Sequence, residues 1–218
     1  MKIDLHIHTS EISQCGHLSC EKVIDLYAAA NYDAIVITNH FNRDTAEYFA
    51  RQGVNDFNKI YHDVLRYAAE FGKARGLLVL GAYEVRFDEN SNDYLVFGMN
   101  ELLCRNYTDI FAMTPAEFSQ FSRQHGLLFY QAHPFRNNMT VVKPELLFGI
   151  EVTNTHPRHD NRNDIAALWA KKYCLHQIAG SDCHRVEDVG TSAIFTNHPV
   201  KNMKDLIYVL ANDLYQIG

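Results

Sequence analysis

Short apolar runs alternate with amphipathic stretches along the whole chain. Most of these runs are too short for helices and are rich in Ile, Val, Leu and Tyr, so they are predicted to be strands. They cover residues 2–7, 34–38, 77–83, 94–98, 127–132, 149–152, 175–179 and 192–195. Apolar residues at helical spacing predict helices over residues 19–30, 55–72, 161–173 and 201–211. Thr114, Pro115 and Glu117 have the pattern of a capped helix start, so another helix is expected to begin at Pro115.

Repeated strand–helix units with nearly continuous apolar strands are typical of a parallel sheet covered by helices. About seven such units in a chain of 218 residues favour a closed or nearly closed barrel over an open sheet. The doubly wound alternative normally has a glycine-rich phosphate loop after its first strand, and this sequence has none. We therefore expect an α/β barrel that forms a single domain over residues 1–218.

Composition narrows the class of protein. The chain is 47% hydrophobic and 21% charged, which is typical of a soluble globular protein. No apolar run approaches the roughly 20 residues that span a bilayer. The first ten residues also lack the apolar segment of a signal peptide. We therefore expect a cytoplasmic protein with no membrane partner. The five cysteines have no zinc-ribbon spacing and are expected to be reduced thiols. The net charge of −6 argues against a stable nucleic-acid complex.

The twelve histidines stand out, and several of them lie where strands are predicted to end. His6 and His8 are two residues apart, so strand alternation directs both imidazoles to one face at the end of the first strand. Asp182 and His184 repeat this spacing, and further strand ends supply His40, Glu84 and His133. The carboxyl ends of parallel barrel strands meet at one mouth, so these side chains are expected to share one metal site.

These segments resemble the polymerase-and-histidinol-phosphatase (PHP) superfamily. The matching pieces, in the expected order along the chain, are residues 4–9 (DLHIHT), 38–40 (TNH), 81–84 (GAYE), 133–134 (HP) and 180–184 (GSDCH). The resemblance implies a distorted seven-stranded (β/α)7 TIM-like barrel with two or three divalent ions, of zinc, manganese or iron. It assigns one ion to His6, His8, Glu84 and Asp182, a second to His40 and His184 with a ligand from the loop after the first strand, and a third to Glu84 and His133.

Three positions depart from the family pattern. The loop after the first strand often supplies an aspartate, but here it reads SQCGH at residues 13–17, and His17 is the candidate ligand. The third ion usually takes another histidine between Glu84 and His133, where Asp93 is the candidate substitute. The usual aspartate before the second-strand histidine is Asn39. Cys183, between two expected ligands, should point away by alternation, whereas the loop position of Cys15 leaves its role open.

The function that the resemblance implies is hydrolysis of a phosphate ester by a metal-activated hydroxide. Arg136 and Arg86 are candidates to bind the phosphate, and His159, with the nearby His156 and Arg158, is a candidate to contact the leaving group. The expected substrate is a small phosphomonoester or a nucleotide. Two alternatives stay open: an exonuclease on short oligonucleotides, and a non-catalytic metal-binding module of a larger assembly.

Overall fold

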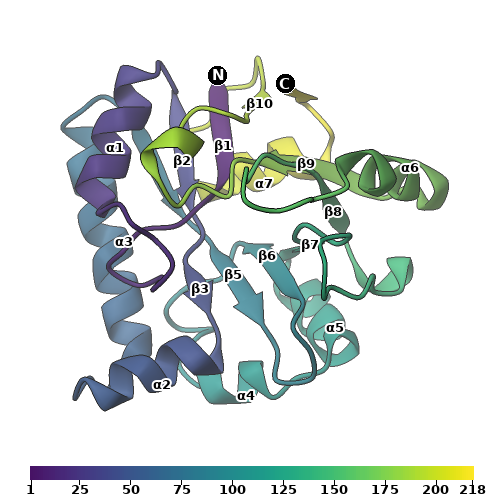
Figure 1. Ribbon diagram of the computed structural model, residues 1–218, viewed down its shortest axis with the longest axis horizontal. Coiled ribbons are helices and arrows are strands. Elements are labelled where there is room, and N and C mark those ends of the chain that lie inside the picture. The colour runs from purple at the N-terminus through teal and green to yellow at the C-terminus, as the bar shows by residue number, and fades with distance from the viewer.

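A computed structural model describes residues 1–218 and arranges the strands in two sheets (Figure 1). The first sheet has the order β11-β10-β1-β2-β4, from strands β1 (Lys2–Ile7), β2 (Ala34–Ile37), β4 (Leu78–Gly81), β10 (Ile194–Phe195) and β11 (Gln216–Ile217). The second has the order β3-β5-β6-β7-β8-β9, from β3 (His40–Phe41), β5 (Tyr83–Arg86), β6 (Asp93–Phe97), β7 (Leu128–Gln131), β8 (Gly149–Asn154) and β9 (His176–Gly180). All eight predicted strands are present in one of these sheets.

Parallel and antiparallel pairs are mixed in both sheets. β1, β2 and β4 run parallel, as do β7, β8 and β9, but β6 is antiparallel to both β5 and β7, and β10 is antiparallel to β1. The short turn between β5 and β6 cannot provide the crossover that parallel neighbours need, so these strands form a hairpin. The α/β class is confirmed, whereas the expectation of a purely parallel sheet is wrong and a closed seven-stranded barrel is not confirmed.

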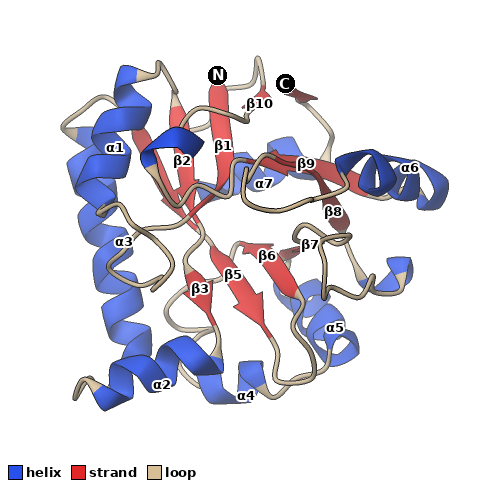
Figure 2. Cartoon of the chain, in the orientation of Figure 1, coloured by secondary structure: helices blue, strands red, loops and turns tan.

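The two sheets meet along a seam where the carboxyl ends of β1, β2 and β4 reach the second sheet (Figure 2). At one side of the seam, the amide of His8 donates to the carbonyl of Cys183 over 3.0 Å. At the other side, the amide of Ala82 donates to Ile37 over 2.8 Å and the amide of Glu84 donates to Asn39 over 3.1 Å. Residues that follow β1, β2, β4 and β9 are therefore brought together at this seam.

Seven α-helices cover the sheets: α1 (Cys20–Ala29), α2 (Arg43–Arg51), α3 (Phe57–Lys73), α4 (Tyr107–Phe111), α5 (Pro115–His125), α6 (Asn163–Tyr173) and α7 (Met203–Ala211). α1 and α3 lie side by side along one edge (Figure 1). The predicted start of α5 is confirmed, because Thr114 and Glu117 form a complete capping box. α2 and α4 were not predicted. None of the helices has the length and apolar character that crossing a bilayer requires.

Two buried tyrosines on the covering helices form hydrogen bonds to residues at the seam. The hydroxyl of Tyr61 on α3 donates to the carbonyls of Asn39 and Ala82, over 2.7 and 3.0 Å. On the other side, Tyr27 of α1 donates to the carboxylate of Asp4 over 2.7 Å, and that carboxylate also accepts from the amides of His6 and Ser181. Since these bonds are buried, they hold the ends of β1, β2, β4 and β9 in a fixed relation.

Candidate metal centre

His6 and His8 extend from the end of β1 into the seam, and both are completely buried. Their Nε2 atoms are 3.1 Å apart. Nδ1 of His6 lies 2.9 Å from a carboxylate oxygen of Glu151, which is an acceptor, so this nitrogen carries the proton. Nδ1 of His8 lies 3.0 Å from the hydroxyl of Ser13. Because that hydroxyl donates its own hydrogen to Asn39, it accepts from His8.

In their neutral forms, both imidazoles therefore present the lone pair of Nε2 to the same point. Two lone pairs at this distance repel unless a positive charge lies between them. Burial disfavours the charged form of His6, but the carboxylates of Glu151, Asp182 and Glu84 outweigh it and raise the pKa of His6 well above its usual value. The structure thus concentrates negative potential where these nitrogens meet, and this donor set fits a divalent cation.

Two carboxylates complete this group. Glu84, from β5, places Oε1 3.2 Å from Nε2 of His6 and Oε2 3.4 Å from Nε2 of His8. Asp182, which follows β9, places Oδ1 3.5 and 3.4 Å from the same two nitrogens. Burial opposes ionisation of both carboxyls, but the surrounding imidazoles hold the pKa of Glu84 and the pKa of Asp182 well below their usual ranges. Both side chains are therefore anionic, as ligands must be.

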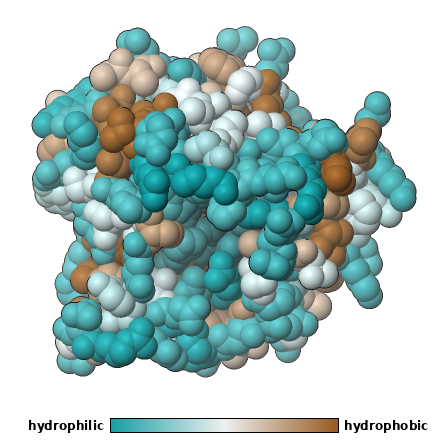
Figure 3. All heavy atoms as spheres, in the orientation of Figure 1, coloured by the Kyte–Doolittle hydropathy of each residue, from teal (hydrophilic) through white to brown (hydrophobic).

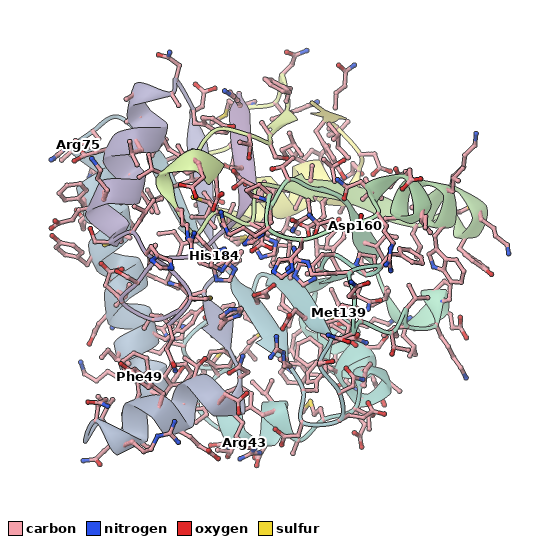
Figure 4. All side chains as sticks on the ribbon, viewed as in Figure 1. Arg43, Phe49, Arg75, Met139, Asp160 and His184 are labelled. Atoms are coloured by element: carbon pink, nitrogen blue, oxygen red, sulfur yellow. The ribbon has the colours of Figure 1, made fainter.

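His40 and His184 lie on either side of His8, with ring centroids 4.5 and 4.4 Å from it. Figure 4 shows the side chain of His184 near the middle of the molecule, among many nitrogen atoms. Nδ1 of His184 lies 2.7 Å from the carbonyl of Asp182, which leaves Nε2 free to bind a ligand. Nδ1 of His40 lies 2.7 Å from Oε2 of Glu84, yet the two atoms are not aligned as a hydrogen bond. Ligand atoms of His8, His40 and His184 lie within 4.8 Å of one another.

His133, after β7, extends this group on the far side of Glu84. Its Nε2 lies 3.2 Å from Oε1 of Glu84, and its backbone has a φ of 29°. Asp182 has a φ of 54°. Non-glycine residues with positive φ are strained by about 1–3 kcal/mol, and such residues concentrate at functional sites. Two of the residues that converge here thus have a backbone conformation that their neighbours must enforce.

The loop after β1 brings Cys15 into this group instead of His17. The thiol sulfur of Cys15 lies 3.2 Å from Nε2 of His40 and 3.1 Å from Nε2 of His184. His17 is exposed, and its Nε2 lies 3.5 Å from the guanidinium of Arg185. His17 lines the same cavity but forms none of these close contacts with the imidazoles, so it stays an untested candidate and Cys15 is the nearer donor.

Asp93 and Arg86 interact with each other. Two guanidinium nitrogens of Arg86 donate to the two carboxylate oxygens of Asp93, each over 2.8 Å. Asp93 also lies within 4.8 Å of ligand atoms of His40 and Glu84, so these three side chains form another potential ligand group, which does not include His133. Both of its oxygens are already engaged by a cation, however, and Arg86 is correspondingly occupied. This pair weakens the candidacy of Arg86 as a free phosphate-binding residue.

A cavity of about 570 Å³ opens over the cluster, and its wall contains the side chains of Arg86, Arg136, Arg158 and Arg185. Figure 3 shows this recess, bordered mainly by hydrophilic residues. Arg136 donates to Asp182 over 2.7 Å, and Arg158 donates to Asp188 over 2.9 Å. Arg185 makes no ion pair with a carboxylate and is the free cation of this wall.

His159 also lines the cavity, with its ring centroid 4.8 Å from that of His156. Partial burial and the charge of Arg136 lower the pKa of His159. Burial is also the main cause that lowers the pKa of His156, to about 4. Both imidazoles are consequently neutral near pH 7, so they are placed to form hydrogen bonds rather than to release a proton.

Comparisons with known proteins identify a partial family match and similar folds. Residues 160–213 match the PHP-associated family model PHP_C. The full chain superimposes on a two-domain protein from Bacteroides vulgatus that contains a predicted PHP-like metal-dependent phosphoesterase, at 19% identity and a TM-score of 0.67. The resemblance to the PHP superfamily is confirmed. The chain spans 64% of the length of that PHP-like protein.

Two further solved structures have a similar fold. A putative metal-dependent phosphoesterase from Bifidobacterium adolescentis matches 95% of this chain over 95% of its own, with 13% identity and a TM-score of 0.55. Endonuclease Q, in complex with a 27-mer duplex that carries an abasic lesion, matches 97% of this chain over 56% of its own, with 11% identity and a TM-score of 0.63. No curated protein matches the sequence. At these identities the neighbours establish the fold.

One residue that the sequence did not single out orients several others in this site. Glu151, in β8, bonds through one oxygen to Nδ1 of His6, and its other oxygen accepts from the amide of His133 and the side chain of Asn154, each over 2.9 Å. Gly180 makes this approach possible, because a Cβ there would lie 2.3 Å from Cβ of His6. The available signal was the glutamate between Ile150 and Val152 in a predicted buried strand, since buried charges are paired.

Proposed function

We propose that the chain is a metal-dependent phosphoesterase that hydrolyses a small phosphomonoester or a nucleotide. The observation that carries the proposal is the approach of the two Nε2 atoms of His6 and His8, which present lone pairs at 3.1 Å beside the anionic Glu84 and Asp182. Such a buried arrangement of acceptors is stabilised by a cation.

The donor set divides into overlapping groups. His6, His8 and Asp182, with Glu84 close to both imidazoles, would hold one ion. His40 and His184, which form a group with His8, would hold a second, and His133 with Glu84 and His6 would contribute to a third. Mixed imidazole and carboxylate ligands suit zinc, manganese or iron better than magnesium, which prefers oxygen ligands. When bound, clustered ions of this kind lower the pKa of a coordinated water and neutralise charge on phosphoryl oxygens.

The residues around the cluster suit a phosphate group. The guanidinium of Arg185 has no carboxylate partner, so it is available to a phosphoryl oxygen. Arg136 is fixed by Asp182 and by Asn154 and Asn161, so it holds the ligand carboxylate in place and presents its remaining donors to the cavity. His159 is placed to donate a hydrogen bond to the leaving group.

The cavity favours a small substrate. About 570 Å³ lies within the range of roughly 300–1,000 Å³ that is typical of small-molecule sites. The net charge of −6 disfavours long polyanions, because nucleic-acid affinity depends on neutralised phosphates. We therefore place a phosphomonoester or a nucleotide ahead of an oligonucleotide.

Hydrolysis assays would test this proposal. Purified protein with Mn²⁺ or Zn²⁺ is expected to hydrolyse p-nitrophenyl phosphate or nucleotides, and His8→Ala should lose at least about 100-fold in rate together with bound metal. His198→Ala, at an exposed histidine outside the cluster, is the matched control and should keep both. Retained metal without turnover of any ester would support the binding-module alternative, and cleavage of short oligonucleotides alone would support the exonuclease.

A further inference from the structure

Cys15 is the one sulfur donor at the cluster. Its sulfur lies 3.2 Å from Nε2 of His40 and 3.1 Å from Nε2 of His184. His184 is only 8% exposed, and its Nε2 has no other hydrogen-bond partner. The other nitrogen of His184 is fixed by the carbonyl of Asp182. The sulfur of Cys15 therefore lies beside the Nε2 atoms of two imidazoles on the cavity side of the cluster.

We propose that Cys15, as a thiolate, ligates the second ion together with His40 and His184, and thereby makes this position selective for zinc or another soft divalent ion over manganese. The inference rests on the proposed metal centre and specifies the chemistry of one of its positions.

The loop holds Cys15 at this point from both sides. Before it, the hydroxyl of Ser13 accepts from the amide of His40 over 3.0 Å. After it, the amide of His17 donates to the carbonyl of His184 over 2.9 Å. Between them, a Cβ on Gly16 would lie 3.0 Å from the carbonyl carbon of Thr9, so the tight path of the loop favours glycine there. The same backbone elements that carry His40 and His184 thus position the thiol.

Asn39 reinforces this placement. Its Oδ1 accepts from the amide of Thr9 over 2.7 Å and from the hydroxyl of Ser13 over 2.9 Å. The residue before His40 consequently ties the loop after β1 to the end of β2. An aspartate could accept these two bonds, but its second oxygen could not donate to the hydroxyl of Thr9 as the amide of Asn39 does over 3.0 Å. Asn39 therefore suits a loop-fixing role at this position.

The spacing agrees with a zinc site. A tetrahedral zinc with Zn–S of about 2.3 Å and Zn–N of about 2.05 Å separates sulfur from nitrogen by about 3.6 Å. The observed separations of 3.1 and 3.2 Å are shorter by a few tenths of an ångström. Small side-chain rotations would therefore open the group to the required size. A solvent molecule or substrate oxygen from the cavity could supply the fourth donor.

The choice of donor has a chemical consequence. Thiolates favour soft or borderline ions such as zinc, cobalt and ferrous iron, whereas carboxylates accept manganese and magnesium. The first group, which contains two imidazoles and two carboxylates, has no such restriction. The two positions should therefore differ in their preference for manganese, and replacing the sulfur by a carboxylate should remove that difference.

Cobalt spectroscopy tests the ligand directly. Metal-free protein titrated with Co²⁺ should develop a thiolate-to-cobalt charge-transfer band in the near ultraviolet, and Cys15→Ser should abolish it while cobalt bound at the other position keeps its visible bands. Cys174→Ser, at the other exposed cysteine, is the matched control and should retain the charge-transfer band. Cys15→Asp should lower zinc affinity by at least about tenfold relative to manganese affinity.

Alkylation gives a second readout that needs no activity. In metal-free protein, iodoacetamide should modify both exposed cysteines, Cys15 and Cys174. Saturating zinc should protect Cys15 alone, as measured by peptide mass spectrometry. If metal binds but gives no charge-transfer band and no protection, the ligand assignment is wrong and the metal centre stands. If no metal binds at all, the proposed function fails together with it.

Discussion

Replacement of Glu151 by glutamine should weaken metal binding without removing a ligand. The carboxylate accepts from Nδ1 of His6 through one oxygen and from the amides of His133 and Asn154 through the other. Glutamine is nearly isosteric, but it has only one acceptor oxygen. In Glu151→Gln, its NH₂ group must therefore face one of these two sets of donors.

Either orientation of the new amide has a cost that follows from these contacts. If NH₂ faces Nδ1 of His6, the imidazole must take the other tautomer, and its Nε2 then carries a hydrogen into the metal site. If NH₂ faces His133 and Asn154, two buried donors lose their acceptor, at about 1–3 kcal/mol for each unsatisfied group. Partners that orient metal-bound histidines typically contribute 10–100-fold in affinity, which is about 1.4–2.7 kcal/mol.

Competition with a chromophoric zinc chelator measures this loss. We expect Glu151→Gln to bind zinc 10–100-fold more weakly and to keep the circular dichroism spectrum of the wild type. Glu70→Gln, at an exposed glutamate of α3, controls for the charge change and should bind as the wild type does. Unchanged zinc affinity in Glu151→Gln would refute the argument that this carboxylate selects the tautomer of His6.

Three other predictions follow from the same contacts. A chelator should lower the melting temperature, because ions at 100 times their dissociation constant add about 2.7 kcal/mol of stability, and an unchanged melting curve would contradict a bound metal. Arg185→Ala should keep the bound metal but weaken inhibition by inorganic phosphate about tenfold or more. Arg136→Ala should lower the metal content as well, because Arg136 pairs with Asp182. Elemental analysis of bound metal, together with phosphate inhibition, distinguishes these two variants. His62→Ala should lose about 1–3 kcal/mol in a denaturation experiment, because buried His62 bonds to Tyr83 and Asn58, yet it should retain the full metal content.

The strands and most helices could be predicted because burial leaves a direct trace in the sequence. The run 2–7 and strand β1 agree at both ends, and the capping residues of α5 mark its start. The direction of β6 could not be read in the same way, since apolar alternation is identical for parallel and antiparallel neighbours. β3 has only two residues, so it leaves no periodic pattern.

In the site, too, some features could be predicted from the sequence and others could not. Alternation predicts that His6 and His8 share one face, and in the structure their Nε2 atoms are indeed close, at 3.1 Å. No such rule could decide whether Cys15 or His17 is the ligand from the loop after β1, because a loop has no fixed side-chain period. The difference between Arg136 and Arg185 depends on which carboxylates lie nearby, and residue types along the chain do not show it.

The order in which the polypeptide is made gives the seam a further significance. His6 and His8 are synthesised long before Asp182 and His184, and β1 cannot bond to the residues after β9 until those residues have emerged. A nascent chain therefore exposes a partial set of donors, open to adventitious metals, until the segment that contains Asp182 and His184 docks. We expect selective metal uptake to follow the docking of this segment, and chains that stop before residue 182 to bind metal loosely.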